Sequence, residues 1–324
     1  MAPLPPGLVE RWYSRGAYPY LQHALTRLSN LVPLSLFDAM LIGGIIAVVL
    51  TVYRGVHRAG WRAGLTRAGV SILQVSAVLY LLFLCTWGLN YRRVQLPDKI
   101  AFDASRITPA ARRALAARTA AELNRLYAPA HAAPASLDGL ADAFREAQGA
   151  LDAPVAFVPG RPKPTLLGGY FHAASIAGMT DPFFLEITVA PDLLEVERPF
   201  VIAHEWGHLS GYADESEASF IAWLACMRAD PAAQYSAWLA LVGHVGVDFS
   251  RAAQPGLDIG PRIDIYAIQT RYRHTNGFLR FAASRSYDKY LKANHVANGI
   301  ESYDSVLQLL LGATYDREWT PRLR

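Results

Sequence analysis

Residues 198–220 read RPFVIAHEWGHLSGYADESEASF, a run that carries two histidines four positions apart. Pro199 stands where the first turn of a helix accepts proline, and Gly211 stands where a helix would stop. The run therefore predicts a helix that ends just before Gly211. On such a helix His204 and His208 share one face, about 5–6 Å apart at Cβ, so both imidazoles can bind one cation.

The pattern His-Glu-x-x-His is typical of zinc enzymes that use water to cleave a bond. Glu205 follows the first histidine and can point toward a metal-bound water without binding the ion itself. We therefore predict one Zn²⁺ ion bound by His204 and His208, with Glu205 as the general base. The alternative is that the histidines are ordinary packing or capping residues and that Glu205 is solvated, but the helical context favours the metal site.

A catalytic zinc ion normally takes three protein ligands, so one more donor is needed. A turn at Gly211 and a second helix would bring Asp214, Glu215 or Glu217 back over the two histidines. Asp214 is a natural N-cap, and Glu217 would then complete a capping box. Glu215 is left without a structural task, and the frame Glu215-x-x-x-Ser219 resembles the ExxxD frame of glutamate-ligated zinc peptidases. We predict Glu215 as the third ligand, and Asp214 and Glu217 stay open.

Around this segment the sequence predicts further helices and a small sheet. Residues 107–127 and 136–150 have the composition and the start signals of amphipathic helices. Residues 183–190 (FFLEITVA) alternate apolar and polar side chains, as a strand with one buried face does. We therefore expect a mainly helical α+β chain, with a helical linker region over residues 92–160 and a zincin-like metallopeptidase domain over residues 161–324.

Two apolar stretches precede this domain, within residues 34–91. Residues 34–53 carry a single charge and residues 68–91 carry none, so each approaches the length that spans a bilayer. The segment between them, 54–67, carries four arginines and no acid, and should therefore face the cytoplasm. We predict two transmembrane helices joined by a short basic cytoplasmic loop, with residues 1–33 and the catalytic domain on the extracytoplasmic side.

The composition agrees with a chain that lies partly in lipid. It is 52% hydrophobic and 18% charged, with a mean hydropathy of +0.15, whereas soluble domains carry about 25% charged residues. Trp87 and Tyr91, at the end of the second apolar stretch, stand where interfacial aromatic residues are expected. The lipid bilayer is therefore the first predicted partner.

The charge and the cysteines exclude other kinds of site. The net charge of +4 and the pI near 9.0 come from scattered arginines rather than from a basic stripe alternating with aromatic residues, so no nucleic-acid partner is expected. Cys85 lies in an apolar run and Cys226 in a predicted helix, far apart in the sequence. Neither a disulfide framework nor a cysteine metal site is expected.

Several short runs spread over nearly the whole chain resemble a known family: VERWYS (9–14), WGLNY (87–91), GYF (169–171), SIAG (175–178), HEWGHLSGYADESEASF (204–220), YDKYLK (287–292) and GIESY (299–303). The resemblance is to a bacterial family known as domain of unknown function 3810. It implies N-terminal membrane spans followed by an HExxH domain that is zinc peptidase-like. It also implies His204 and His208 as ligands, Glu205 as base, and an acid from the Glu-x-Glu-Ala segment, Glu215 or Glu217.

The sequence thus predicts a multi-pass metallopeptidase of the bacterial inner membrane that acts on a peptide or protein substrate. Two alternatives remain: a catalytically silent membrane scaffold with a structural metal site, and a site-2-type intramembrane protease. The intact Glu205 disfavours the first, and the charged residues flanking the motif disfavour the second. Tyr287, His295 and Tyr303 are candidate oxyanion donors, although packing or surface roles are expected for them.

Overall fold

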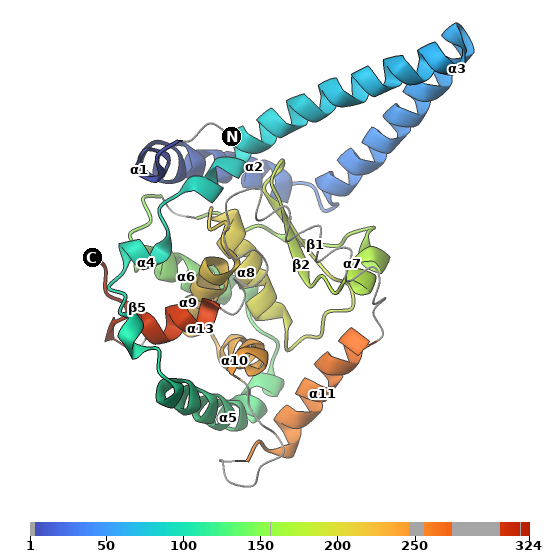
Figure 1. Ribbon diagram of the computed structural model, residues 1–324. Helices are drawn as coiled ribbons and strands as arrows, with labels where there is room; N and C mark the ends of the chain where they lie inside the picture. Colours follow the sequence, from blue (N-terminus) through green and yellow to red (C-terminus); the bar gives the residue numbers. More distant parts are fainter. Residues whose placement is uncertain (1–3, 156, 246–255, 274–304, 318) are drawn as a thin grey trace.

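The computed structural model describes residues 4–155, 157–245, 256–273, 305–317 and 319–324. It consists of a helical body with a small sheet, from which one long helical hairpin projects (Figure 1). The N-terminal elements are α1 (Pro6–Val9), η1 (Glu10–Ala17), α2 (Tyr18–Asn30), α3 (Leu36–Thr86), η2 (Gly88–Arg92), α4 (Leu96–Lys99) and η3 (Ala104–Arg106). The body helices are α5 (Pro109–Ala132), α6 (Leu137–Gly149), α7 (Gly168–Ala174), α8 (Arg198–Leu209), α9 (Glu215–Cys226), α10 (Pro231–Val245), α11 (Ile259–Arg273) and α13 (Ser305–Gly312). The strands are β1 (Pro162–Lys163), β2 (Gly178–Asp181), β3 (Glu186–Val189), β4 (Tyr315–Arg317) and β5 (Thr320–Pro321), so the expected mainly helical chain with a small sheet is confirmed.

The hairpin α3 contains two stretches, Leu36–Arg58 and Gly60–Thr86, that are long and apolar enough to cross a membrane. Only 6% and 11% of their most apolar windows are buried, so most of their side chains face outward. Helical backbone continues through the basic segment 54–67, where the sequence indicated a loop, and only Gly60 departs from it, with φ 78°. Arginine favours helix and glycine takes positive φ at no steric cost, so the reversal needs only one residue.

The three-stranded sheet has the order β1-β3-β2, with β3 parallel to β1 and antiparallel to β2. β2 is therefore an edge strand, and β3 is central and buried on both faces. The expectation of a half-buried strand is wrong because Glu186, on the second face, is covered and paired. Its carboxylate lies 2.6 Å from Nζ of the buried Lys163 and accepts hydrogen bonds from Ser29 Oγ and the Phe37 amide. Alternation of residue types cannot reveal a charge that is buried with a partner.

The helices that precede the hairpin belong to the same core as the body. Tyr18 OH donates to the carbonyl oxygen of Leu209 at 2.7 Å, at the end of α8. Thr26 Oγ1 donates to the carbonyl oxygen of Leu185 at 2.8 Å, next to β3. Both donors are buried. The N-terminal segment therefore contacts the helix and the strand that flank the candidate site.

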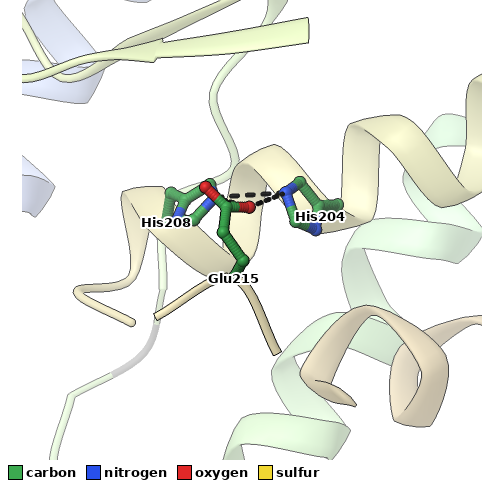
Figure 2. Close-up of side chains that lie close together, drawn as sticks. All are labelled: His204, His208 and Glu215. Atoms are coloured by element: carbon green, nitrogen blue, oxygen red, sulfur yellow. Dashed lines mark hydrogen bonds and ion pairs between the residues drawn. The ribbon is translucent and has the colours of Figure 1, made fainter. Parts of the chain in front are cut away.

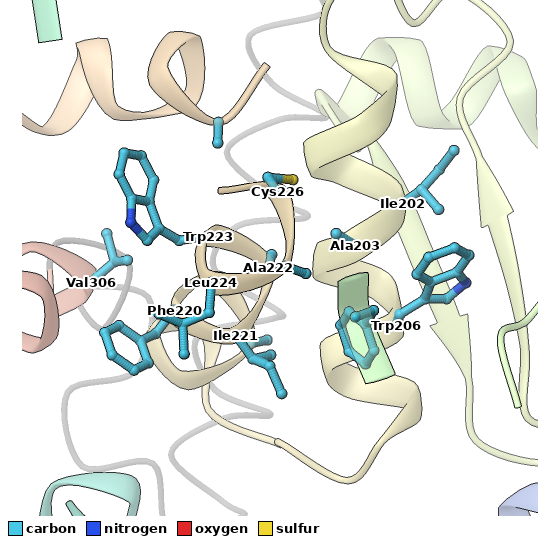
Figure 3. Packing of buried hydrophobic residues seen from close by; sticks show 14 of the residues in the cluster. Ile202, Ala203, Trp206, Phe220, Ile221, Ala222, Trp223, Leu224, Cys226 and Val306 are labelled. Atoms are coloured by element: carbon cyan, nitrogen blue, oxygen red, sulfur yellow. The ribbon is translucent and has the colours of Figure 1, made fainter. Parts of the chain in front are cut away.

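The core centres on α8 and α9, which approach each other closely. A Cβ added at Gly207 would lie 2.9 Å from Cα of Ala218, so the two backbones are almost in contact. Every residue of α9 is buried, and Trp223 packs edge-on to Trp238 with 4.6 Å between ring centroids. Figure 3 shows Trp206 on the opposite side of α8, directed away from α9. Packing on both sides fixes the position of α8 and therefore the positions of the candidate site residues that it carries.

Candidate metal centre

The two histidines of α8 lie together, as their spacing predicts. The helix begins at Arg198 with Pro199 in its first turn and ends at Leu209. His204 Nε2 and His208 Nε2 are 3.1 Å apart, and the ring centroids are 4.7 Å apart. One helical turn thus brings two ligand nitrogens to the same point in space.

A carboxylate from α9 joins them. Gly211, with φ 89°, lets the chain turn back directly after α8. Glu215 is the first residue of α9, and its Oε2 lies 3.1 Å from His204 Nε2 and 3.2 Å from His208 Nε2 (Figure 2). The three side chains converge from two helices that meet at the turn.

The two other acids that the sequence left open have different partners. Asp214 is the N-cap of α9 and accepts hydrogen bonds from the amides of Ser216 and Glu217. Glu217 Oε1 accepts a hydrogen bond of 2.5 Å from the amide of Leu96, in the segment that follows the hairpin. Glu217 therefore bonds to a distant segment, whereas a capping box would direct it to the N-cap. Of the three acids, the structure brings Glu215 to the histidines.

The second nitrogen of each imidazole is also engaged. His208 Nδ1 lies 2.8 Å from the carbonyl oxygen of Tyr212. A carbonyl can only accept, so Nδ1 carries the proton and Nε2 is directed toward Glu215. His204 Nδ1 lies 3.1 Å from Ser219 Oγ, one turn along α9 from Glu215. Such contacts orient the ring of a metal-binding histidine and fix its tautomer.

The three ligand atoms fit a tetrahedral ion. Their pairwise separations are 3.1, 3.1 and 3.2 Å. Donors that bind tetrahedral zinc at about 2.0–2.1 Å are roughly 3.3 Å apart, close to the triangle seen here. Among the residues that the structure describes, no other group of three His, Cys, Asp or Glu side chains is placed to hold an ion.

Charge at the centre is balanced between the acid and the imidazoles. Burial would raise the pKa of Glu215, but the two histidines outweigh it and hold the pKa well below its usual range. Burial would lower the pKa of His208, but the Glu215 carboxylate beside it raises that pKa to about 9. The acid is thus ionised and strongly attracts positive charge to the point where the three side chains meet.

Glu205 lies beside the triangle, held from the edge strand. Thr180 Oγ1, on β2, donates to Glu205 Oε2 at 2.8 Å and to its backbone oxygen at 2.9 Å. A Cβ added at Gly178 would lie 2.7 Å from Glu205 Oε1, so a side chain on this residue would collide with the carboxylate. Burial raises the pKa of Glu205. The carboxylate is therefore buried and adjacent to the sheet edge, and the hydrogen bond from Thr180 to one of its two oxygens orients it.

The segment after the hairpin supports the turn that follows α8. Trp87 Nε1 donates to the carbonyl oxygen of His208 at 2.9 Å, and Trp87 is buried, so its side chain packs in the body rather than facing outward as an interfacial aromatic side chain would. Arg93 donates to the carbonyl oxygen of Gly211 at 2.8 Å, and its guanidinium lies 4.4 Å from the ring centroid of Tyr212. Sequence reasoning missed these roles, and the only signal for Trp87 was its place in the run WGLNY.

Tyr287, His295 and Tyr303 lie outside the residues that the structure describes. Trp206 and Tyr212, which lie in the segment that carries the three candidate ligands, are both buried. Trp206 packs against Phe144 and Phe157.

Comparison with known proteins gives one result. No curated protein matches the chain, and no solved structure does. A family model, described as protein of unknown function (DUF3810), matches residues 13–311. That range includes the hairpin, the triangle of ligand atoms and Glu205. The chain therefore belongs to the family of proteins of unknown function DUF3810.

Proposed function

We propose that the protein is a membrane-anchored zinc metallopeptidase in which His204, His208 and Glu215 bind one zinc ion and Glu205 is the general base. The observation that carries the proposal is the triangle of ligand atoms 3.1–3.2 Å apart, with a buried carboxylate on the residue that follows His204. Three protein ligands are typical of catalytic zinc sites, whereas structural sites are usually closed by four.

In this proposal each residue of the site has a separate role in hydrolysis of the peptide bond. Zinc, when bound, lowers the pKa of water and polarises a carbonyl group. Glu205 would take the proton of the attacking water on Oε1, because Oε2 is held by Thr180. The same carboxylate would then give that proton to the leaving amine. The hydrogen bond from Thr180 keeps the base in one orientation through both transfers.

The substrate that this geometry favours is an extended peptide or protein segment. β2 is an edge strand, and its residue Gly178 lies against Glu205. A peptide that added a strand at this edge would be held by main-chain hydrogen bonds, alongside the base. The contact of the edge strand β2 with the HExxH helix α8, through Thr180 and Glu205, also supports a zincin-like arrangement of the domain.

The hairpin supports a location in the bacterial inner membrane. Both halves of α3 are long, apolar and outward-facing. The tip of the hairpin carries four arginines and no acid between residues 54 and 67, which favours a cytoplasmic location of the tip under the positive-inside rule. The body, with its candidate site, would then be extracytoplasmic. Because α8 and α9 belong to the body, catalysis outside the bilayer is favoured over a site-2-type mechanism.

Comparing Glu205→Gln with the unchanged protein tests the activity. Zinc content and cleavage of a quenched fluorescent peptide library would be measured on the full chain in detergent micelles. We expect equal zinc and a rate lowered by roughly 10²–10⁴-fold, because proton transfer is lost while the ligands remain. Glu195→Gln, in an exposed glutamate shortly before α8, is the control and should cleave normally. Equal zinc with no cleavage by any of the three proteins would favour a structural metal in a membrane scaffold.

A further inference from the structure

The helical segment formed by α1, η1 and α2 packs one of its faces against the body. Besides Glu10, its buried residues recur along the segment at spacings of three to five: Val9, Ser14, Tyr18, Gln22, Thr26 and Ser29. Several of them donate hydrogen bonds to the body, including Tyr18 to Leu209 and Thr26 to Leu185. The orientation of the segment about its own axis is therefore fixed.

The opposite face exposes large apolar and aromatic side chains. Trp12 and Tyr20 are each 67% exposed, Leu28 is 62% exposed, and Leu31, directly after α2, is 79% exposed. Their positions differ by eight, eight and three residues, which keeps them on one side of the segment. A water-facing helix of a soluble body would not be expected to gather such side chains in a line.

The same face carries positive charge without acid. Glu10 is the only acidic residue before Asp38, and it is buried, where it pairs with Arg93 and Lys99. Arg11 and Arg27 are exposed, and the Arg11 guanidinium lies 5.1 Å from the ring centroid of Trp12. Arginine beside tryptophan, tyrosine and leucine is the composition of helices that lie in the headgroup layer of a membrane.

The segment is also placed where a bilayer surface would be. It lies at the base of the hairpin, between the two legs of α3 and the helical body (Figure 1). The exposed Leu31 and Leu34 lead directly into Leu36, where the first apolar stretch begins. The exposed face is therefore continuous with the outward-facing apolar surface of the hairpin.

We propose that α1, η1 and α2 form an interfacial helix that lies on the phospholipid surface, with Trp12, Tyr20, Leu28 and Leu31 at the acyl boundary and the arginines at lipid phosphates. This inference rests on the membrane location proposed above. Because Tyr18, on the reverse face, bonds to the residue that follows His208, the interfacial helix would hold the metal centre at a constant height above the bilayer.

The depth of spin labels attached to the full chain tests whether the segment lies at the membrane surface. In a background with Cys85→Ala and Cys226→Ala, single cysteines would replace Trp12, Tyr20 or Leu31. The proteins would be placed in bilayers of phosphatidylethanolamine and phosphatidylglycerol, and collision rates with oxygen and with a water-soluble nickel complex would be compared. Oxygen concentrates in lipid and the nickel complex in water, so their ratio reports depth.

Two further positions make the outcome decisive. Leu73, in the hairpin, is 71% exposed. Arg113 is exposed on α5, at the end of the body away from the hairpin. Each would be replaced by cysteine and labelled in the same way. We expect the oxygen-to-nickel ratio at residues 12, 20 and 31 to be several times that at residue 113, and to be highest at residue 73. A high ratio at residue 73 with a water-like ratio at the three N-terminal positions would overturn the interfacial helix while leaving the hairpin in lipid.

Two other results would also overturn the inference, in distinguishable ways. A water-like ratio at residue 73 would remove the membrane location itself. Shielding of the N-terminal labels from both reagents, together with dipolar broadening between identical labels, would show that a second copy of the chain covers this face.

Discussion

Ser219 stands where the ExxxD frame has an aspartate, and it still reaches the imidazole that the aspartate would hold. Its Oγ lies 3.1 Å from His204 Nδ1, so the shorter side chain keeps the contact that orients the ring. An uncharged side chain four residues after Glu215 thus keeps a contact with the ring of His204.

Replacing Ser219 should weaken zinc binding. Ser219→Ala removes the contact to His204 Nδ1 and should lower the zinc affinity roughly 10-fold or more, as measured by competition with a chelator. Ser219→Asp supplies an acceptor at the same place and should bind zinc at least as tightly as the unchanged protein. Equal affinities for serine and alanine would show that this contact does not orient the ligand.

Gly178→Ala should lower the rate of peptide cleavage and leave the zinc content unchanged. The new Cβ would lie 2.7 Å from Glu205 Oε1, so the carboxylate must move while the ligands stay in place. A displacement of this size should lower the cleavage rate about 100-fold with unchanged zinc content. Gly169→Ala, with nothing within 4 Å of the added Cβ, is the matched control. Normal cleavage by Gly178→Ala would mean that Glu205 is not the base in this orientation.

At the scale of single elements, β2 ends in a buried acid, directly before the turn to β3. Asp181 is 1% exposed, its Oδ2 accepts a hydrogen bond of 2.6 Å from the Phe184 amide, and burial raises its pKa to about 7. The folded chain thus prefers the protonated acid. The stability that this preference contributes is complete below the unfolded pKa near 4 and is lost as the pH rises through about 7.

Asp181→Asn should remove this pH dependence. Between about pH 5 and pH 8 the unchanged protein should lose roughly 2–3 kcal/mol of unfolding free energy relative to Asp181→Asn. Thermal unfolding of both proteins in detergent at several pH values measures the difference, and other titrating groups cancel between them. Parallel stability curves would show that Asp181 is ionised in the fold.

Residues that start or stop helices allowed those helices to be predicted from the sequence. The start signals at residues 107–127 and 136–150 correspond to α5 and α6, and Pro199 and Gly211 bracket α8. Features set by distant segments were not predictable in this way. The second face of β3 is covered by the N-terminal segment, and Glu217 is engaged by the Leu96 amide. The position of Glu215 depends on the packing of α9 against α8, so spacing alone left three acids open.

At the scale of the whole molecule, segments from both sides of the hairpin converge on the candidate metal centre. Tyr18, before it, bonds to the end of α8, and Trp87 and Arg93, after it, bond to His208 and Gly211. The sequence treated the membrane segment and the catalytic domain as successive units. In the structure they share a core, because the chain enters the hairpin beside β3 and leaves it beside the turn between α8 and α9.

The proposed orientation predicts opposite accessibility for the two ends of the molecule. In the background with Cys85→Ala and Cys226→Ala, Arg113→Cys in the body should react with a membrane-impermeant thiol reagent in intact spheroplasts. Trp61→Cys, exposed at the tip of the hairpin, should react only after the membrane is broken. The reverse pattern would place the body in the cytoplasm.

X-ray absorption at the zinc edge of the purified full-length protein tests the central claim most directly. We predict one zinc per chain, with a shell of nitrogen and oxygen donors at about 2.0–2.1 Å that includes two imidazoles. In Glu215→Ala the zinc content should fall well below one, since one side of the triangle is lost. A chain without stoichiometric zinc, or a shell that lacks imidazole, would contradict the metal centre and the hydrolase built on it.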